Sequence, residues 1–119
     1  MKIAITSEGR DLSSPVDDRF GRAKGFIIYD IDSAEFDFIE NSQGLDSIQG
    51  AGIQATKTVI NAGIKSLITG NVGTKAHSAL VAAEIDIFTG ARGTVMDAIE
   101  KYQSGILKKT SRDNMESFG

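Results

Sequence analysis

The 119-residue sequence contains no cysteine and no tryptophan, and it has one proline and one histidine. Without cysteine the chain can form no disulfide, no thiolate nucleophile and no cysteine-ligated zinc or iron–sulfur site. Any metal would have to be held by oxygen, by imidazole or through an outer-sphere contact. Because His77 is the single histidine, a multi-histidine metal site is excluded and a Ser-His-Asp triad has at most one candidate base.

The sequence also lacks a basic excess and a long apolar run. Its formal net charge is −3, with 40% hydrophobic and 24% charged residues, a balance typical of a globular domain. Nucleic-acid and membrane-surface binding usually leave a basic excess, so neither is expected. The start, MKIAI, turns polar too early for a signal peptide. We expect a cytoplasmic protein with a single domain over residues 1–107 and a flexible tail over 108–119.

Apolar and β-branched runs predict five strands, at residues 2–6, 26–31, 35–40, 66–69 and 85–89. The first strand has no polar alternation, which is typical of a central strand covered on both faces. A short polar connection joins the second and third strands and predicts an antiparallel hairpin. Helical spacing predicts three helices, over 48–62, within 72–83 and from 95 to near 105.

This order of elements predicts an α/β fold with a mixed five-stranded sheet. Right-handed crossovers place the first, fourth and fifth strands side by side and parallel. Their carboxyl ends then meet at one edge, which is where open α/β sheets bind ligands.

The connection over residues 7–25, SEGRDLSSPVDDRFGRAKG, is the predicted working part of the molecule. Irregular connections longer than about 15 residues are uncommon in compact domains unless they bind something or are disordered. Pro15, Phe20 and the RFGR run are atypical of a mobile linker. Because few backbone groups of this loop should have a strand partner, we expect it to be the least protected ordered segment.

Two segments, at 69–74 and 89–94, share the pattern T-G-x-x-G-T, and each falls between a predicted strand and a predicted helix. One interpretation is turn chemistry alone, with glycine at positive φ and threonine as the N-cap. The other is that backbone N–H groups and helix N-termini face one crevice and attract an anion. The spacing matches neither G-x-G-x-x-G nor the P-loop pattern.

Several motifs together resemble the dinitrogenase iron-molybdenum cofactor biosynthesis family, of the NifX and NafY type that also forms the C-terminal part of NifB proteins. They are MKIAIT at the start, S-P-V-x-x-R-F-G-R-A at 14–23, F-x-x-Y-D-I-D at 26–32, G-A-G at 50–52 and the T-G-x-x-G turn. The resemblance implies a ribonuclease H-like fold and a protein that binds or carries an iron-molybdenum or iron–sulfur cluster transiently, without catalysis. It implies cluster donor or acceptor proteins as partners.

The predicted cofactor-binding residues are Arg19, Phe20, Gly21, Arg22, Asn71 and Gly73. The two arginines, with Lys24, would supply charge, Gly21 would let the backbone approach, and Asn71 and Gly73 would present N–H groups. Phe20 is interpreted as an anchor that pins the loop to the core and sets the angle of Arg19.

Arg19 marks a departure from the family pattern. Cofactor-binding members that resemble this sequence typically have histidine at this position, and a guanidinium cannot ligate a metal but can pair with anionic oxygens or sulfides. A competing interpretation of this stretch is a solvated loop whose Asp17 and Asp18 neutralise the basic residues.

Three further alternatives stay open. Asp30, Asp32 and Asp86 invite comparison with ribonuclease H-like nucleases, but those enzymes carry an aspartate within the first strand, and residues 2–6 contain none. The long loop could instead dock on a partner enzyme. His77 is predicted at the rim of its helix, as a ligand-binding or a surface residue.

Overall fold

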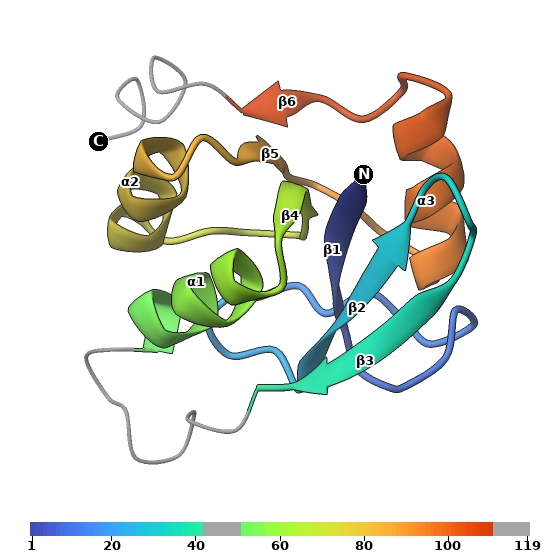
Figure 1. Cartoon of the computed structure of the whole chain (residues 1–119), viewed down its shortest axis with the longest axis horizontal. Coiled ribbons are helices and arrows are strands. Elements are labelled where there is room, and N and C mark those ends of the chain that lie inside the picture. The colour runs from blue at the N-terminus through green and yellow to red at the C-terminus, as the bar shows by residue number, and fades with distance from the viewer. Residues whose placement is uncertain (42–50, 111–119) are drawn as a thin grey trace.

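The computed structural model describes residues 1–41 and 51–110. Within these ranges the strands form one six-stranded sheet in the order β3-β2-β1-β4-β5-β6 (Figure 1). The strands are β1 (Lys2–Ser7), β2 (Gly25–Asp30), β3 (Phe36–Glu40), β4 (Ile64–Ile68), β5 (Asp86–Phe88) and β6 (Lys109–Thr110). β1, β4 and β5 are parallel neighbours, and β2 and β3 form an antiparallel hairpin beside β1. The predicted α/β class, hairpin and parallel strands are confirmed.

The predicted count of five strands is wrong because it omits β6. This two-residue strand pairs antiparallel with β5, and the Thr110 hydroxyl donates to Ile87 O at 2.8 Å. Its sequence is polar and too short to show a period, so it falls within the predicted flexible tail over 108–119. Residues 111–119 of this tail lie outside the described residues. The ribonuclease H-like designation of the fold stays a prediction.

Helices α1 (Ala51–Asn61) and α2 (Thr74–Ala82) cover one face of the sheet, and α3 (Val95–Gln103) covers the other (Figure 1). All three predicted helices are present, although residues 48–50 of the first lie outside the described range. None of the helices in the described ranges is long and apolar enough to cross a membrane.

The two faces of β1 explain the apolar run at the centre of this strand. Ala4 packs in the cluster formed with α1 and α2, whereas Ile3 and Ile5 pack in the cluster formed with α3. Because side chains alternate between the faces of a strand, a strand covered on both sides shows no alternation of apolar and polar residues. The prediction of a central, doubly covered strand is confirmed.

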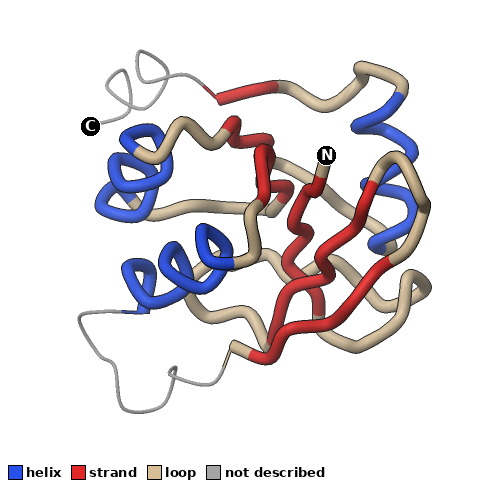
Figure 2. The backbone as a smooth tube through the Cα atoms, viewed as in Figure 1, coloured by secondary structure: helices blue, strands red, loops and turns tan. Residues whose placement is uncertain are grey.

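The connection between β1 and β2 contains no helix and runs across the carboxyl ends of the parallel strands (Figure 2). Few of its backbone groups pair with a strand of the sheet, as expected, and its other hydrogen bonds go to the loop itself, to the two turns and to the start of α3. The low protection of the loop stays a prediction. The loop forms isolated bridges at Val16, Pro15 and Arg19 with β1 and with both T-G-x-x-G-T turns. Such non-local pairs leave no period in the sequence.

Candidate functional site

Two threonines join the loop to the carboxyl edge of the sheet. Thr6, near the end of β1, has its Oγ1 2.7 Å from Asp17 O and 2.9 Å from the Oγ1 of Thr69, which follows β4. The Asp17 N–H donates to Thr6 O at 3.0 Å. All three residues are buried. The predicted convergence of the loop and the strand ends is therefore confirmed by direct contacts.

The loop crosses the first T-G-x-x-G-T turn as a short strand-like bridge. Phe20 N donates to Asn71 O at 3.1 Å, and Asn71 N donates to Asp18 O at 2.7 Å. A Cβ on Gly70 would lie 2.6 Å from Asp18 O, so this crossing requires glycine at position 70. Because the Asn71 N–H is used in the bridge, its predicted role of presenting that N–H to a ligand is wrong.

The second turn is closed by the same loop. The Thr94 side chain and Asp97 form a capping box at the start of α3. The next two N–H groups donate to the loop, from Val95 to Ser14 O and from Met96 to Leu12 O, both at 2.9 Å. The predicted N-cap role of threonine is confirmed here, and no N–H group at the start of α3 faces a ligand unpaired.

The start of α2 differs, although its sequence has the same pattern. Gly73 is the N-cap residue and no side chain caps the helix. Within the described ranges, the N–H groups of Thr74, Lys75 and Ala76 have no hydrogen-bond acceptor. The prediction of threonine as the cap of this helix is therefore wrong. The first turn of α2 leaves free donors at the positive end of its dipole.

A cavity of about 640 Å³, called here the arginine cavity, lies in front of this helix end. Its described lining comes from the loop, from α1 and from the turn into α2, and consists of Arg19, Phe20, Gly21, Arg22, Gly52, Asn71, Val72, Gly73, Thr74, Lys75 and Ala76. All six predicted site residues are in this set. The structure thus brings together residues that are about 50 positions apart in the sequence.

The charge of the described lining is positive. Arg19, Arg22 and Lys75 contribute cations, and no aspartate or glutamate is among the described lining residues. Within residues 1–41 and 51–110, neither Arg19 nor Lys75 forms an ion pair. Asp17, predicted in one interpretation to neutralise the arginines, is buried and accepts from the Arg19 backbone N–H at 3.1 Å. Asp17 therefore forms no ion pair with Arg19.

Phe20 holds the loop against the sheet, as predicted. Phe20 is 1% exposed, and its ring centroid lies 5.7 Å from that of Phe26 in β2. Burial of a phenylalanine side chain contributes about 2 kcal/mol, enough to fix one point of a surface loop. The backbone beside it then holds Arg19 and Gly21 at the cavity.

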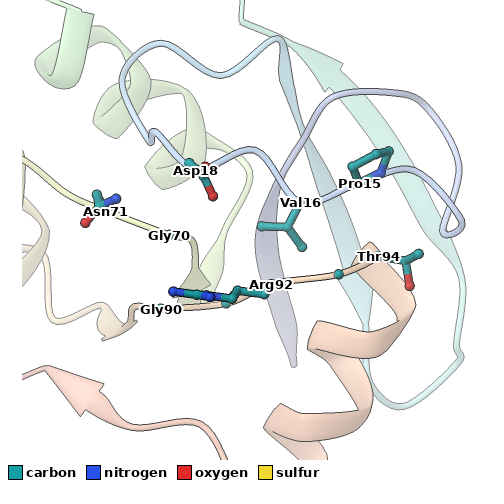
Figure 3. A pocket seen from close by; sticks show the side chains of 10 residues that line it. Pro15, Val16, Asp18, Gly70, Asn71, Gly90, Arg92 and Thr94 are labelled. Carbon is teal, nitrogen blue, oxygen red and sulfur yellow. The ribbon is translucent and has the colours of Figure 1, made fainter.

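A second cavity, of about 680 Å³, lies on the other side of the Arg19–Asn71 bridge. It is lined by residues 15, 16 and 18 of the loop and by both turns, and Asn71 lines both cavities. Figure 3 shows Asp18 and Arg92 on facing sides of it. Arg92 and Lys75 are cavity residues that the sequence reasoning missed, although each stands in or directly after a T-G-x-x-G-T segment.

The prediction of His77 at the rim is wrong. The residue is 3% exposed. The buried side of α2 includes His77 as well as Ala76 and Leu80, so it is wider than the predicted apolar stripe. Its Nε2 is buried without a partner in the described part of the chain, and burial lowers its pKa. His77 lines neither cavity described above.

The three candidate nuclease carboxylates lie at the opposite end of the sheet. Asp30 pairs in register with Lys2, at the amino end of β1. The Asp32 carboxylate pairs with the Met1 amino group at 2.7 Å. The Asp32 backbone N–H donates to the Asp30 carboxylate, and this hydrogen bond lowers the pKa of Asp30. Asp86 pairs with Lys109 at 3.0 Å. The described residues contain no cluster of three histidine, aspartate or glutamate side chains that could hold a metal ion.

Comparison with known proteins gives the family. A family model described as dinitrogenase iron-molybdenum cofactor matches residues 1–105, and the chain belongs to this family. The predicted resemblance is confirmed.

Individual proteins are similar to this chain over most of its length. The apo form of the orange protein from Desulfovibrio gigas is 35% identical, with a TM-score of 0.90 over 92% of both chains. A putative NifB protein from Thermotoga is 36% identical, with a TM-score of 0.80 over 94% of this chain and 97% of that one. An uncharacterized protein of Methanocaldococcus jannaschii is 29% identical over 92% of this chain and 91% of its own length.

Proposed function

We propose that this chain is a non-catalytic carrier or accessory protein that binds an anionic metallocluster, of the iron-molybdenum or iron–sulfur type, or a similar compact anion, in the arginine cavity. The observation that carries the proposal is the uncapped start of α2 beside three basic side chains. The contrast with α3 supports it, since the N–H groups from Thr94 to Asp97 at the start of that helix all donate within the chain.

The chemistry of the lining favours an outer-sphere contact. Guanidinium and ammonium groups pair with anionic oxygen or sulfide but do not ligate metals. The N–H groups of Thr74 and Lys75 and the exposed Gly73 backbone add donors that suit an anion. A cluster held this way would enter with its own ligands complete and leave without breaking a metal–protein bond, which suits a transient carrier in the cytoplasm.

The family supports the choice of ligand, because its description names the iron-molybdenum cofactor of dinitrogenase. On this proposal the partners are proteins that donate a cluster to the cavity or accept one from it. No observation favours the hydrolase alternative, because Asp30 and Asp32 lie at the other end of the sheet and interact with the Met1 amino group.

Metal retention tests the proposal. The purified protein is mixed anaerobically with a cluster donor, passed through gel filtration and analysed for bound metal. We expect the wild type to retain metal and Lys75→Ala to retain less. Lys57→Ala, which removes an exposed lysine of α1 outside the cavity, serves as the matched control. If the wild type retains no more metal than the background of the assay, the result would instead favour a loop that docks on a partner protein.

A further inference from the structure

Asn41 contacts the loop of the arginine cavity without lining that cavity. It directly follows β3, and its side-chain Nδ2 donates to Gly21 O at 3.1 Å and to Ala23 O at 2.9 Å. Its backbone N–H donates to Lys24 O at 2.9 Å. One side chain from the hairpin therefore holds the loop at two carbonyl groups, and the backbone holds it at a third.

The orientation of this amide follows from its partners. Both Gly21 O and Ala23 O are acceptors, so the NH₂ group of Asn41 must face them. The Oδ1 atom is then left buried, with no hydrogen-bond partner in the described part of the chain. An unpaired buried oxygen destabilises the folded state, so this side chain contributes through the two hydrogen bonds that its NH₂ group donates. Those bonds hold the loop backbone at both carbonyl groups.

The two carbonyl groups held by Asn41 flank Arg22, which lines the arginine cavity. Phe20 fixes the chain on the other side of Gly21, because its ring is packed in the core. The backbone that carries Arg22 is thus constrained both before and after it. Such constraint lowers the conformational entropy that ligand binding would otherwise cost.

We propose that Asn41 is a positioning residue of the arginine cavity, which acts on the bound anion through Arg22. The inference rests on the proposed function and deepens it, because it assigns part of the affinity to a residue that does not touch the ligand. Asn41 is 9% exposed and its contacts to Gly21 and Ala23 span about 20 positions of sequence, so no local pattern indicates this role.

The first test needs no ligand. In Asn41→Leu, which keeps the size of the side chain and removes its donors, the backbone ¹³C′ shifts of Gly21 and Ala23 should change. The ¹⁵N relaxation of residues 21–24 should show increased motion. Ser66→Ala is the control, because it removes a partly buried hydrogen bond to Tyr102 on the other side of the sheet. Unchanged shifts and relaxation at 21–24 would overturn the proposal, whether or not any anion binds.

The second test measures binding of tetrathiomolybdate, MoS₄²⁻, by absorption titration and calorimetry. Asn41→Leu should weaken binding about tenfold, by analogy with the smallest effects of losing an outer-shell partner at metal sites. Asn41→Gln, which keeps an NH₂ group, should recover part of this loss, and Ser66→Ala should bind like the wild type. In an Arg22→Ala background, Asn41→Leu should cause no further loss of affinity, because Asn41 acts on the anion through Arg22.

The outcomes separate the two proposals. Equal binding by the wild type and Asn41→Leu, or the same loss with and without Arg22, refutes positioning through Arg22 while the proposed function stands. No binding of MoS₄²⁻ by the wild type counts against the proposed function, and the NMR comparison then decides the role of Asn41 alone.

Discussion

Gly70 lies directly beneath Asp18, so close that a Cβ at position 70 would be 2.8 Å from the Asp18 Cα. The three nearest atoms to this Cβ all belong to the Asp18 backbone, which cannot rotate away as a flexible side chain can. The crossing of the loop over the first turn therefore depends on the absence of a side chain at one position.

Gly70→Ala should consequently destabilise the fold by about 2 kcal/mol, the typical cost of inserting a methyl group where no space exists. Gly73→Ala is the matched control, since Gly73 has φ −70° and its Cβ would meet nothing within 4 Å. We expect the control to change stability by less than about 1 kcal/mol. Urea unfolding measures both variants, and equal losses would contradict the close crossing.

The two turns should respond differently to loss of their threonines. Thr94→Ala removes the capping box of α3 and should lower the free energy of unfolding by about 1 kcal/mol. Thr74→Ala should have little effect, because Gly73 is the N-cap of α2 and no side chain caps it. Thermal and urea unfolding check this pair. A loss at Thr74 as large as that at Thr94 would show that both turns are capped alike.

Arg19 should bind the anion through an outer-sphere contact that combines charge with the bidentate fork of its guanidinium. Arg19→Ala should weaken binding of MoS₄²⁻, and added salt should weaken the wild type, because exposed charges are screened over about 10 Å at 0.1 M ionic strength. Arg19→Lys should retain part of the affinity, since it keeps the charge and loses the bidentate fork. Arg10→Ala is the matched control, as that guanidinium lies 4.9 Å from the Phe38 ring centroid, outside the cavity.

Arg19→His is the informative change of this series, and it is tested with the metallocluster. If related proteins bind their cluster through the histidine of the family pattern, this variant should bind more tightly and with less sensitivity to salt. Its metal spectrum should show a nitrogen ligand. Unchanged cluster retention in all three Arg19 variants would remove Arg19 from the site.

His77 should make the stability of the fold depend on pH. Burial lowers its pKa below the ordinary value of 6.5, so the unfolded chain takes up the proton more readily than the folded chain. The contribution of neutral His77 is fully present above pH 6.5 and is lost as the pH falls below it. Urea unfolding at pH 7.5, 6.5 and 5.5 should show falling stability. His77→Gln should flatten this slope, and an unchanged slope would exclude His77 as its source.

The fold and the location of the site follow from patterns that the sequence shows. The continuous apolar run of β1 indicates a doubly covered strand, and parallel strands then bring the loop and both turns to one edge. Those two facts placed all six predicted residues around one cavity.

What the sequence could not show depends on contacts between distant residues. The two T-G-x-x-G-T segments have different helix starts because the loop supplies acceptors to α3 and none to α2. The burial of His77 depends on the width of the covered face of α2, and β6 is too short to have a period. Asn41 reaches Gly21 only through the hairpin. None of these contacts leaves a local signal.

The arginine cavity takes its walls from the loop, from α1 and from the turn into α2, so no single segment of the chain contains it. A ligand seated there should bind the folded domain in preference to the unfolded chain. Binding should therefore raise the melting temperature of the whole domain, in proportion to the logarithm of free ligand concentration once the site is saturated. Thermal-shift measurements across a panel of oxo- and thioanions can thus rank candidate cargoes by their affinity for the folded chain.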